Sequence, residues 1–185
     1  MPTRADLIAA LEAHLPFDAQ EAAMLARVLA FVRAEELCFE RTLLAGHVTA
    51  SAWVVDPALS QTLLVRHAKL HRWLQPGGHC DGDPGVLANA LREVREETGL
   101  TRITPLLEGR IFDVDAHDIP ARGAEPAHVH YDIRFLVQAD PSEPLQLSDE
   151  SHALAWVRLE DVASLDTDAS VLRLAARTRA LGRSR

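Results

Sequence analysis

The stretch that most constrains the fold is 77–100, where a glycine-rich loop leads directly into a helix with two unlike faces. Asp83 and Pro84 suit the N-cap and the first helical position. Gly99 suits the left-handed residue that commonly ends a helix, so the pattern predicts a helix over 84–98. Three aliphatic residues recur on one side of it, Leu87, Leu91 and Val94. We therefore expect this helix to pack on the core by one face only.

The other face carries Glu93, Glu96 and Glu97, whose spacing gathers three carboxylates within one turn. These like charges repel each other, and they lie near the helix C-terminus, where the macrodipole disfavours negative charge. Such a pattern lowers stability, which indicates a function. Carboxylate oxygens at this density suit Mg²⁺ or Mn²⁺. A solvated acidic face paired with Arg92 and Arg95 is the purely structural alternative.

Two glycines precede this helix, Gly77 and Gly78, and they allow the backbone to approach a ligand closely. The segment resembles the Nudix box, G-x5-E-x7-R-E-U-x-E-E-x-G-U, in which U is aliphatic. The matching positions are Gly78, Arg92, Glu93, Val94, Glu96, Glu97, Gly99 and Leu100. One position departs from the box, because Pro84 stands where the family has a supporting glutamate near the helix start. We expect Asp83 to supply a carboxylate from the preceding position.

The resemblance implies an α/β fold, the Nudix α/β/α sandwich with a mixed sheet. It also implies a hydrolase that cleaves a diphosphate linkage in a nucleoside diphosphate derivative or similar small molecule, by attack of a metal-activated water on phosphorus. The implied cofactor is Mg²⁺ or Mn²⁺, and the implied metal ligands are Gly78, through its carbonyl, Glu93, Glu96 and Glu97. Glu93 and Glu97 are then catalytic residues, and Arg92 is an orienting partner. A non-catalytic Nudix-like binding or regulatory module and an isoprenoid diphosphate isomerase are alternatives. Cys80 suits a packing position better than isomerase chemistry.

Further site residues lie outside the box. Family members often carry a carboxylate on a loop before a late strand, and Glu150 fits that role as a general base or second-metal ligand, with Asp149 as runner-up. The expected substrate-binding residues are Arg66, Trp73, His128 and His130. His128 and His130 share one face of a predicted strand, a spacing that could bind zinc, but no third ligand is evident nearby in the sequence.

The first 45 residues read as a helical segment. Thr3 with Asp6 predicts the cap of a first helix, which Pro16 ends, and its apolar face is Leu7, Leu11 and Leu15. Asp18 with Glu21 forms a capping-box pattern for a second helix, whose apolar stripe is Leu25, Val28, Leu29 and Val32. We expect residues 1–45 to pack on a Nudix hydrolase domain at 46–185. A dimerisation arm, giving a homodimer, is the alternative.

From residue 46 onward the pattern becomes mixed. Strand-like segments are expected at 47–55, 62–65, 103–114, 128–137 and 153–159. A short helical turn at 160–165 and an amphipathic helix over 170–181 close the chain. Strands and helices alternating in this way indicate α/β or α+β packing.

Composition narrows the function classes. The 185 residues suit one sizeable core, and 48% apolar with 25% charged residues is ordinary for a globular domain. A net charge of −8 argues against nucleic-acid binding, whereas a divalent cation can reconcile an acidic chain with an anionic small-molecule substrate. We expect no membrane association, because no apolar run is long enough to span a bilayer and the N-terminus carries no secretory pattern. Two cysteines indicate a reducing cytoplasm.

Overall fold

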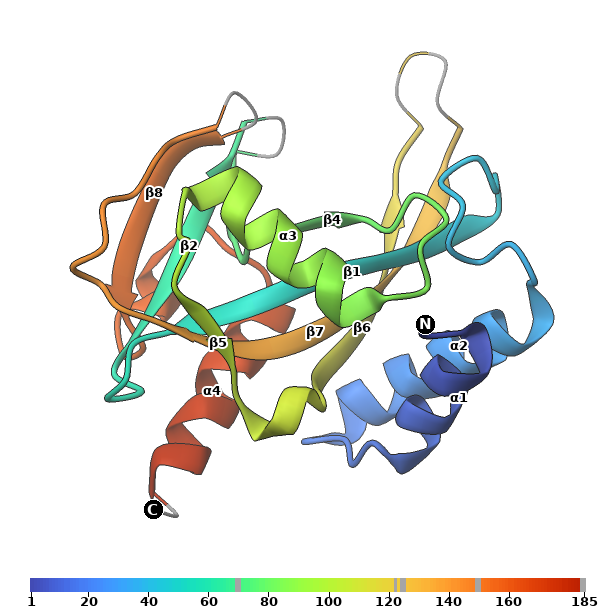
Figure 1. The fold of residues 1–185 in the computed structure, drawn as a ribbon, viewed down its shortest axis with the longest axis horizontal. Coiled ribbons are helices and arrows are strands. Elements are labelled where there is room, and N and C mark those ends of the chain that lie inside the picture. Colours follow the sequence, from blue (N-terminus) through green and yellow to red (C-terminus); the bar gives the residue numbers. More distant parts are fainter. Residues whose placement is uncertain (69–70, 122, 124–125, 149–150, 184–185) are drawn as a thin grey trace.

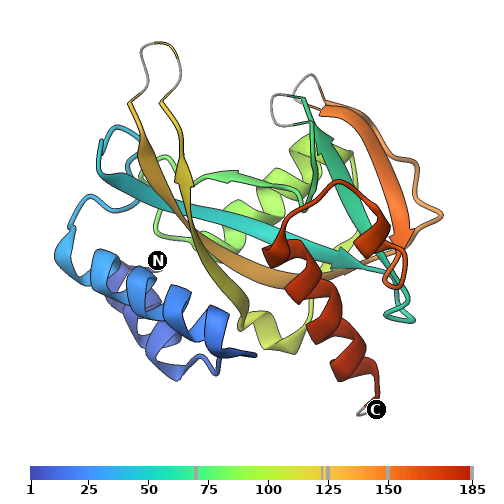
Figure 2. The same ribbon diagram turned by 180° about the vertical axis from the view of Figure 1, so that it is seen from behind.

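The computed structural model describes residues 1–68, 71–121, 123, 126–148 and 151–183. A central mixed sheet is covered on one face by helix α3 (Val86–Thr98) and on the other by helix α4 (Ala169–Arg183), as Figures 1 and 2 show from opposite sides. The expected α/β/α sandwich is therefore confirmed.

The sheet is built around two parallel neighbours, β1 (Gly46–Val55) and β7 (His128–Ala139). The main path through it runs β3-β2-β1-β7-β5, while β4 also pairs with β1, β6 with β7 and β8 with β2. The remaining strands are β2 (Gln61–His67), β3 (Trp73–Leu74), β4 (Gly77–His79), β5 (Ile103–Pro105), β6 (Ile111–Ile119) and β8 (Ser151–Arg158). These outer strands pair antiparallel to their neighbours.

Strand alternation in β1 divides the core into two layers, because successive side chains point to opposite faces. Val48, Ala50, Ala52 and Val54 belong to the layer under α3, which includes Ala90 and Val94 of that helix. Trp53 and Val55 belong to the layer under α4. The Trp53 indole donates a hydrogen bond to the Thr178 hydroxyl of α4 at 2.9 Å, so the buried ring satisfies its polar atom.

The N-terminal residues form the expected helices, α1 (Arg4–Ala13) and α2 (Ala19–Ala34). The Thr3–Asp6 capping box is present, and the Asp18 side chain accepts from the Glu21 amide at 2.8 Å. The Glu21 carboxylate does not complete a second box, because it is buried and bonded elsewhere. Leu15 does not share the apolar face of α1, since it follows the helix end and is 80% exposed.

The α2 helix packs on the sheet, where Phe31 stacks on Tyr131 of β7 with ring centroids 3.9 Å apart. Leu7, Leu11, Val28 and Val32 are buried in the same layer of core as α3. The split at residue 45 and the homodimer stay predictions. In the part of the chain that the structure describes, no helix combines the length and apolar character needed to cross a membrane.

The single strand expected over 103–114 is wrong in detail. It is broken into β5 and β6 by a short 3₁₀ turn at Leu107–Gly109, in which three consecutive residues have φ between 53° and 72°. Both halves nevertheless pair with β7, so the chain leaves the sheet and returns to the same neighbour. Strands β3 and β4 were not expected, and the helical turn near residue 162 is a 3₁₀ turn at Val162–Ser164.

Candidate active site

Helix α3 begins two residues later than expected. Gly85 is its N-cap, and the Asp83 carboxylate accepts from the Gly85 amide at 2.8 Å, so it closes a turn before the helix. Pro84 therefore lies outside the helix, and Asp83 does not cap it. The Asn89 side-chain amide donates to the Asp83 carbonyl at 3.1 Å and anchors this turn to the first helical residues.

Two glutamate side chains of α3 contact the two glycines of β4, Gly77 and Gly78. The Gly77 amide donates to Glu97 Oε2 at 3.0 Å. A Cβ placed on Gly78 would lie 2.6 Å from Glu93 Oε1, so the missing side chain of Gly78 leaves the space that this carboxylate occupies. Gly78 itself is held in the sheet opposite Ala50 of β1. Strand pairing thus fixes the surface on which two carboxylates converge.

Arg92 holds the acidic face together. Its guanidinium contacts Glu93 Oε1 at 2.9 Å and Glu96 Oε2 at 2.8 Å. It also donates to the His79 carbonyl at 2.9 Å, which ties the helix to the end of β4. Partial burial opposes the charged form, but Glu93 and Glu96 outweigh it and raise the pKa of Arg92. One cation thus screens the repulsion among the carboxylates.

The donor set fits a hard divalent cation. The Glu93 side chain is only 13% exposed, whereas that of Glu96 is 57% exposed. Glu97 and Gly78 are half-buried beside Glu93. Carboxylate and carbonyl oxygens are the preferred ligands of Mg²⁺ and Mn²⁺, and the space above Gly78 already accommodates one carboxylate. The structure therefore brings together the residues expected as metal ligands, although their roles stay predictions.

The other expected residues lie elsewhere. Arg66 is exposed on β2, directly opposite Trp73 of β3. Trp73 is half-buried and packs against the α4 layer of the core, and its carbonyl accepts from the Thr167 hydroxyl at 2.6 Å. The Trp73 ring therefore packs on the core in part, and its role in substrate binding stays a prediction. Glu150 and its runner-up Asp149 lie outside the described residues.

His128 and His130 belong to a larger group of imidazoles that the sequence did not reveal. His47 of β1, His79 of β4 and His117 of β6 each have a ring centroid within 5.6 Å of that of His130. One sequence signal could have found part of this group: polar residues alternate along the middle strands, as in His47, Thr49 and Ser51. Such alternation is unusual in a strand that is buried throughout.

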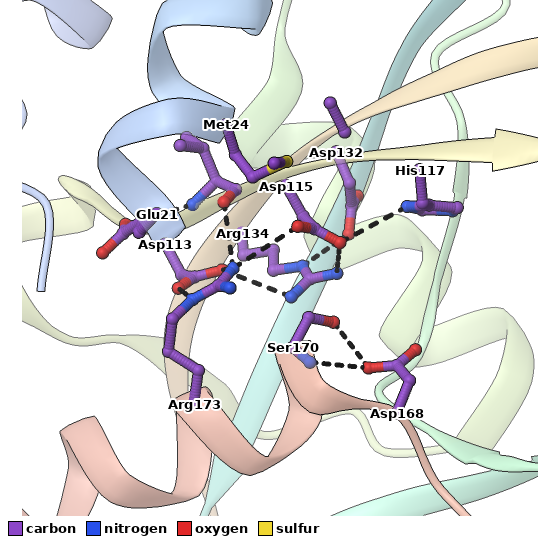
Figure 3. A network of polar contacts seen from close by, with 12 residues as sticks. Glu21, Met24, Asp113, Asp115, His117, Asp132, Arg134, Asp168, Ser170 and Arg173 are labelled. Atoms are coloured by element: carbon purple, nitrogen blue, oxygen red, sulfur yellow. Dashed lines mark hydrogen bonds and ion pairs between the residues drawn. The ribbon is translucent and has the colours of Figure 1, made fainter. Parts of the chain in front are cut away.

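Beyond the imidazoles the same face of the sheet carries a buried ionic network (Figure 3). Arg134 of β7 pairs with Asp132 at 2.7 Å, Asp113 at 3.2 Å and Asp115 at 3.3 Å. Arg173 of α4 pairs with Asp113 at 2.7 Å. Burial opposes the charge on Arg134, but the three carboxylates outweigh it and raise its pKa. The network therefore fixes α4 to β6 and β7.

A cavity of about 750 Å³ opens between α1, the N-terminal half of α3 and the start of β6. Its lining is mostly apolar and includes Leu7, Leu87, Leu91 and Ile111. The glutamates of α3 do not line it. A diphosphate is bound by cations and hydrogen-bond donors, and the mostly apolar lining of this cavity offers few of them. The carboxylates of α3 can hold a divalent cation. The carboxylate face is therefore a better candidate for the active site than this cavity.

The sequence matches the NUDIX domain family over residues 46–177. The chain belongs to this family. The match contains the box, the sheet and most of α4, and it begins after the two N-terminal helices. The chain is similar to the asymmetrical bis(5'-nucleosyl)-tetraphosphatase of Mus musculus, with 33% identity over 99 residues, 52% of this chain and 62% of that protein.

Other relatives agree with the family assignment. A probable DHNTP pyrophosphohydrolase of Lactococcus lactis is 31% identical over 98 residues, 52% of this chain and 56% of that protein. This Nudix chain thus spans less than two thirds of the length of these two relatives. The fold is also similar to that of a C. elegans Ap4A hydrolase in a binary complex, with a TM-score of 0.60 and 22% identity over 75% of this chain and 98% of that one.

Proposed function

We propose that this Nudix chain is a metal-dependent hydrolase that cleaves a diphosphate linkage in a nucleoside diphosphate derivative or similar small molecule. The observation that carries this proposal is the convergence of Glu93 and Glu97 on the backbone of Gly77 and Gly78. Oxygen ligands are held there on two rigid elements, a helix and a strand paired with the centre of the sheet. Rigid placement of this kind is what catalysis on a diphosphate requires.

The proposed ligands are the Gly78 carbonyl and the Glu93, Glu96 and Glu97 carboxylates. A Mg²⁺ or Mn²⁺ ion bound there would neutralise charge on diphosphate oxygens and lower the pKa of the attacking water. Arg92 keeps Glu93 and Glu96 in position through its two ion pairs. The Gly77 amide orients Glu97. Glu150 remains the proposed general base or additional ligand.

Two substrate classes follow from the relatives. Their names refer to bis(5'-nucleosyl) tetraphosphates and to DHNTP, which are molecules that carry a phosphate chain. We infer that this chain acts on a phosphate anhydride attached to a nucleoside or a similar ring. Arg66 and Trp73 remain proposed contacts for the organic part. A substrate contact at His128 and His130 is the alternative to metal binding by these rings.

The isomerase alternative is disfavoured by the state of Cys80. This thiol is 2% exposed, and burial, followed by the charges of Asp132 and Asp83, raises its pKa to about 12. It is therefore protonated at neutral pH and packs in the core under α3. A non-catalytic binding module remains the competing hypothesis, because it would use the same carboxylates without turnover.

The test is Glu97→Gln, measured with Mg²⁺ on a panel of dinucleoside polyphosphates, nucleotide sugars, ADP-ribose, coenzyme A and nucleoside triphosphates. We expect a loss of turnover of roughly 100-fold or more, because glutamine keeps the size of the side chain but removes the charge that a cation needs. The metal-free thermal midpoint should be unchanged or slightly higher, because Gln can still accept from Gly77 and one repulsion is relieved.

Glu160→Gln is the matched control, since this glutamate is exposed and pairs only with solvent-facing Arg158 among the described contacts. It should retain full turnover. Full activity of Glu97→Gln on a substrate that the wild type cleaves would refute the metal assignment. Binding without turnover by the wild type across the panel would favour the non-catalytic module.

A further inference from the structure

Three strands and one strand end bring imidazoles to one place. His47 of β1 lies opposite His130 of β7 in the parallel register, and His117 of β6 lies opposite His130 on its other side. His79 ends β4, where it lies opposite Thr49 of β1. Because alternate residues of a strand share a face, His128 falls on the same side as His130. The cluster is therefore a product of strand pairing.

The ring nitrogens of three of these histidines lie close enough together to bind one metal ion. His47, His79 and His130 each offer a ring nitrogen, and these three atoms lie within 4.8 Å of one another. In a tetrahedral zinc site, Zn–N distances are about 2.0–2.1 Å, which places ligand nitrogens about 3.3–3.4 Å apart. Modest side-chain rotations would close that difference. The group thus resembles a site whose rings are assembled before a cation binds.

An unpartnered buried ring provides a second, independent observation. His47 is 2% exposed, yet neither of its ring nitrogens has a hydrogen-bond partner within the described chain. The Leu43 backbone lies close enough to raise the pKa of the ring, but no contact between them meets the geometry of a hydrogen bond. Buried polar atoms are normally satisfied by protein, water or an ion, so such a ring calls for a ligand. Its neighbours are imidazoles, which supply lone pairs.

The protonation state of the cluster favours a cation over an anion. Burial first, and neighbouring imidazoles second, lower the pKa of His47 to about 4 and that of His130 to about 2. Burial of this kind favours neutral imidazole, whose lone pair binds a metal, and the three ring nitrogens already lie within 4.8 Å of one another. A phosphate would instead be attracted by protonated imidazoles.

His128 supports the cluster through a hydrogen bond with His130. Its Nδ1 contacts the Pro126 carbonyl at 2.9 Å, so Nδ1 carries the proton and Nε2 offers a lone pair in the neutral ring. That Nε2 lies 3.1 Å from His130 Nε2, so in the neutral pair His130 Nε2 carries its proton and donates to His128. A ligating histidine in a metal site usually donates its other ring N–H to an acceptor, and His128 is that acceptor for His130.

We propose that His47, His79 and His130 form a second cation site, separate from the carboxylates of α3, for a late first-row divalent ion of the Zn²⁺ class. Imidazole suits Zn²⁺, Co²⁺, Ni²⁺ and Cu²⁺, whereas Mg²⁺ prefers oxygen ligands. The site joins the starts of β1 and β7 to the end of β4. His79 directly follows Gly78 in β4, and Gly78 contacts the Glu93 carboxylate. An ion bound by His79 would therefore also fix the position of β4 beneath Glu93.

The experiment measures Zn²⁺ by equilibrium dialysis and Co²⁺ by its visible absorption, both in excess Mg²⁺ so that the carboxylates of α3 are saturated. The wild type should bind one equivalent of Zn²⁺ and give the intense spectrum of tetrahedral Co²⁺. Zn²⁺ at about 100 times its dissociation constant should raise the thermal midpoint by roughly 5–10 °C.

Four variants locate the site. His130→Gln and His79→Gln should each lose the tetrahedral spectrum and weaken Zn²⁺ binding at least roughly tenfold. His79 ends the short strand β4 whereas His130 lies within β7, so His79→Gln tests the site even where His130→Gln unfolds. Glu97→Gln should keep the Zn²⁺ equivalent, as should His152→Gln, which removes an exposed imidazole outside the cluster.

Three outcomes overturn the proposal. The first is a wild type that binds no Zn²⁺ in excess Mg²⁺. The second is binding that survives in both His130→Gln and His79→Gln, or that is lost in Glu97→Gln, which would place the ion at the carboxylates. The third is stabilisation by inorganic phosphate, but not by Zn²⁺, that depends on His130, which would make the cluster part of a substrate subsite.

Discussion

Gly78 shows how much the site depends on one absent side chain. The position that its Cβ would take lies 2.6 Å from both Cδ and Oε1 of Glu93. Real Cβ atoms do not approach other atoms this closely, so a side chain here and the present Glu93 position exclude each other. Because the obstructing atoms are the end of a flexible side chain, the carboxylate can move away while the backbone stays in place.

We therefore predict that Gly78→Ala lowers turnover roughly 10–100-fold while the free energy of unfolding changes by less than about 1 kcal/mol. A displacement of about 1 Å is enough for such a loss of rate. Turnover with Mg²⁺ and urea denaturation of the same preparations check this. Unfolding of the variant, or unchanged turnover, would show that Gly78 serves the strand and not the carboxylate.

At the scale of elements, the end of α3 is fixed as firmly as its acidic face. Gly99 has φ 75° and ψ −3°, so the expected left-handed C-cap is confirmed. Its amide donates to the Arg95 carbonyl at 3.0 Å, and the Gln146 amide donates to the Thr98 carbonyl at 2.8 Å. A Cβ on Gly99 would lie 2.6 Å from the Cβ of Gln146. Conformation and space both require glycine here.

Gly99→Ala should lower the free energy of unfolding by about 2–3 kcal/mol, because left-handed backbone strain of about 1–2 kcal/mol adds to the contact with Gln146. Urea denaturation measures it. Gly182→Ala is the matched control, since Gly182 lies within α4 with open space around its Cβ position. That change should stabilise by up to about 1 kcal/mol, because alanine is the better helix former. Equal effects of the two substitutions would contradict the argument.

At the scale of the whole molecule, Glu21 links parts of the chain that are far apart in sequence. It is fully buried, and its carboxylate contacts His14 Nε2 at 2.6 Å and Arg177 of α4 at 2.8 Å. It also accepts from the amides of Phe17 and of Val114 in β6. The N-terminal helices, the sheet and α4 therefore meet at one carboxylate.

Burial by itself would raise the pKa of Glu21, but hydrogen bonds from His14 and Phe17 and the charge of Arg177 outweigh it and lower the pKa below its ordinary 4.5. A carboxyl with a lowered folded-state pKa stabilises the fold above its unfolded pKa. That contribution is lost as the pH falls through the lower, folded-state value. Stability should thus depend on Glu21 at neutral pH and progressively less in acid.

We predict that Glu21→Gln lowers the free energy of unfolding by about 1.5–3 kcal/mol at pH 7, the range for a hydrogen-bonded charge. The difference from wild type should shrink well below the ordinary pKa of 4.5. Denaturation curves at pH 7 and about pH 3 test this. Glu12→Gln is the control, because Glu12 pairs with Arg33 at the surface and should change stability by less than about 0.5 kcal/mol. A pH-independent loss would contradict the charge argument.

Much of the candidate site was readable from the sequence. The acidic face of α3, its left-handed end at Gly99 and the two glycines of β4 follow from spacing within about 24 residues, where local geometry determines which side chains meet. The caps of α1 and α2 are local in the same sense. The prediction that Asp83 caps α3 was wrong, because one carboxylate can accept either from a helix amide or from the amide of a preceding turn. In the structure it accepts from Gly85 and closes the turn.

What the tertiary structure alone decided is the partnership of distant residues. His47 and His130 are 83 positions apart and meet because β1 and β7 pair in parallel. Arg173 reaches Asp113 because α4 returns across the sheet. The spacing of residues in the sequence does not show in which register two distant strands pair. That register determines which side chains face each other. The sequence by itself therefore determined the carboxylate face, whereas strand pairing determined the imidazole cluster and the ionic network beneath α4.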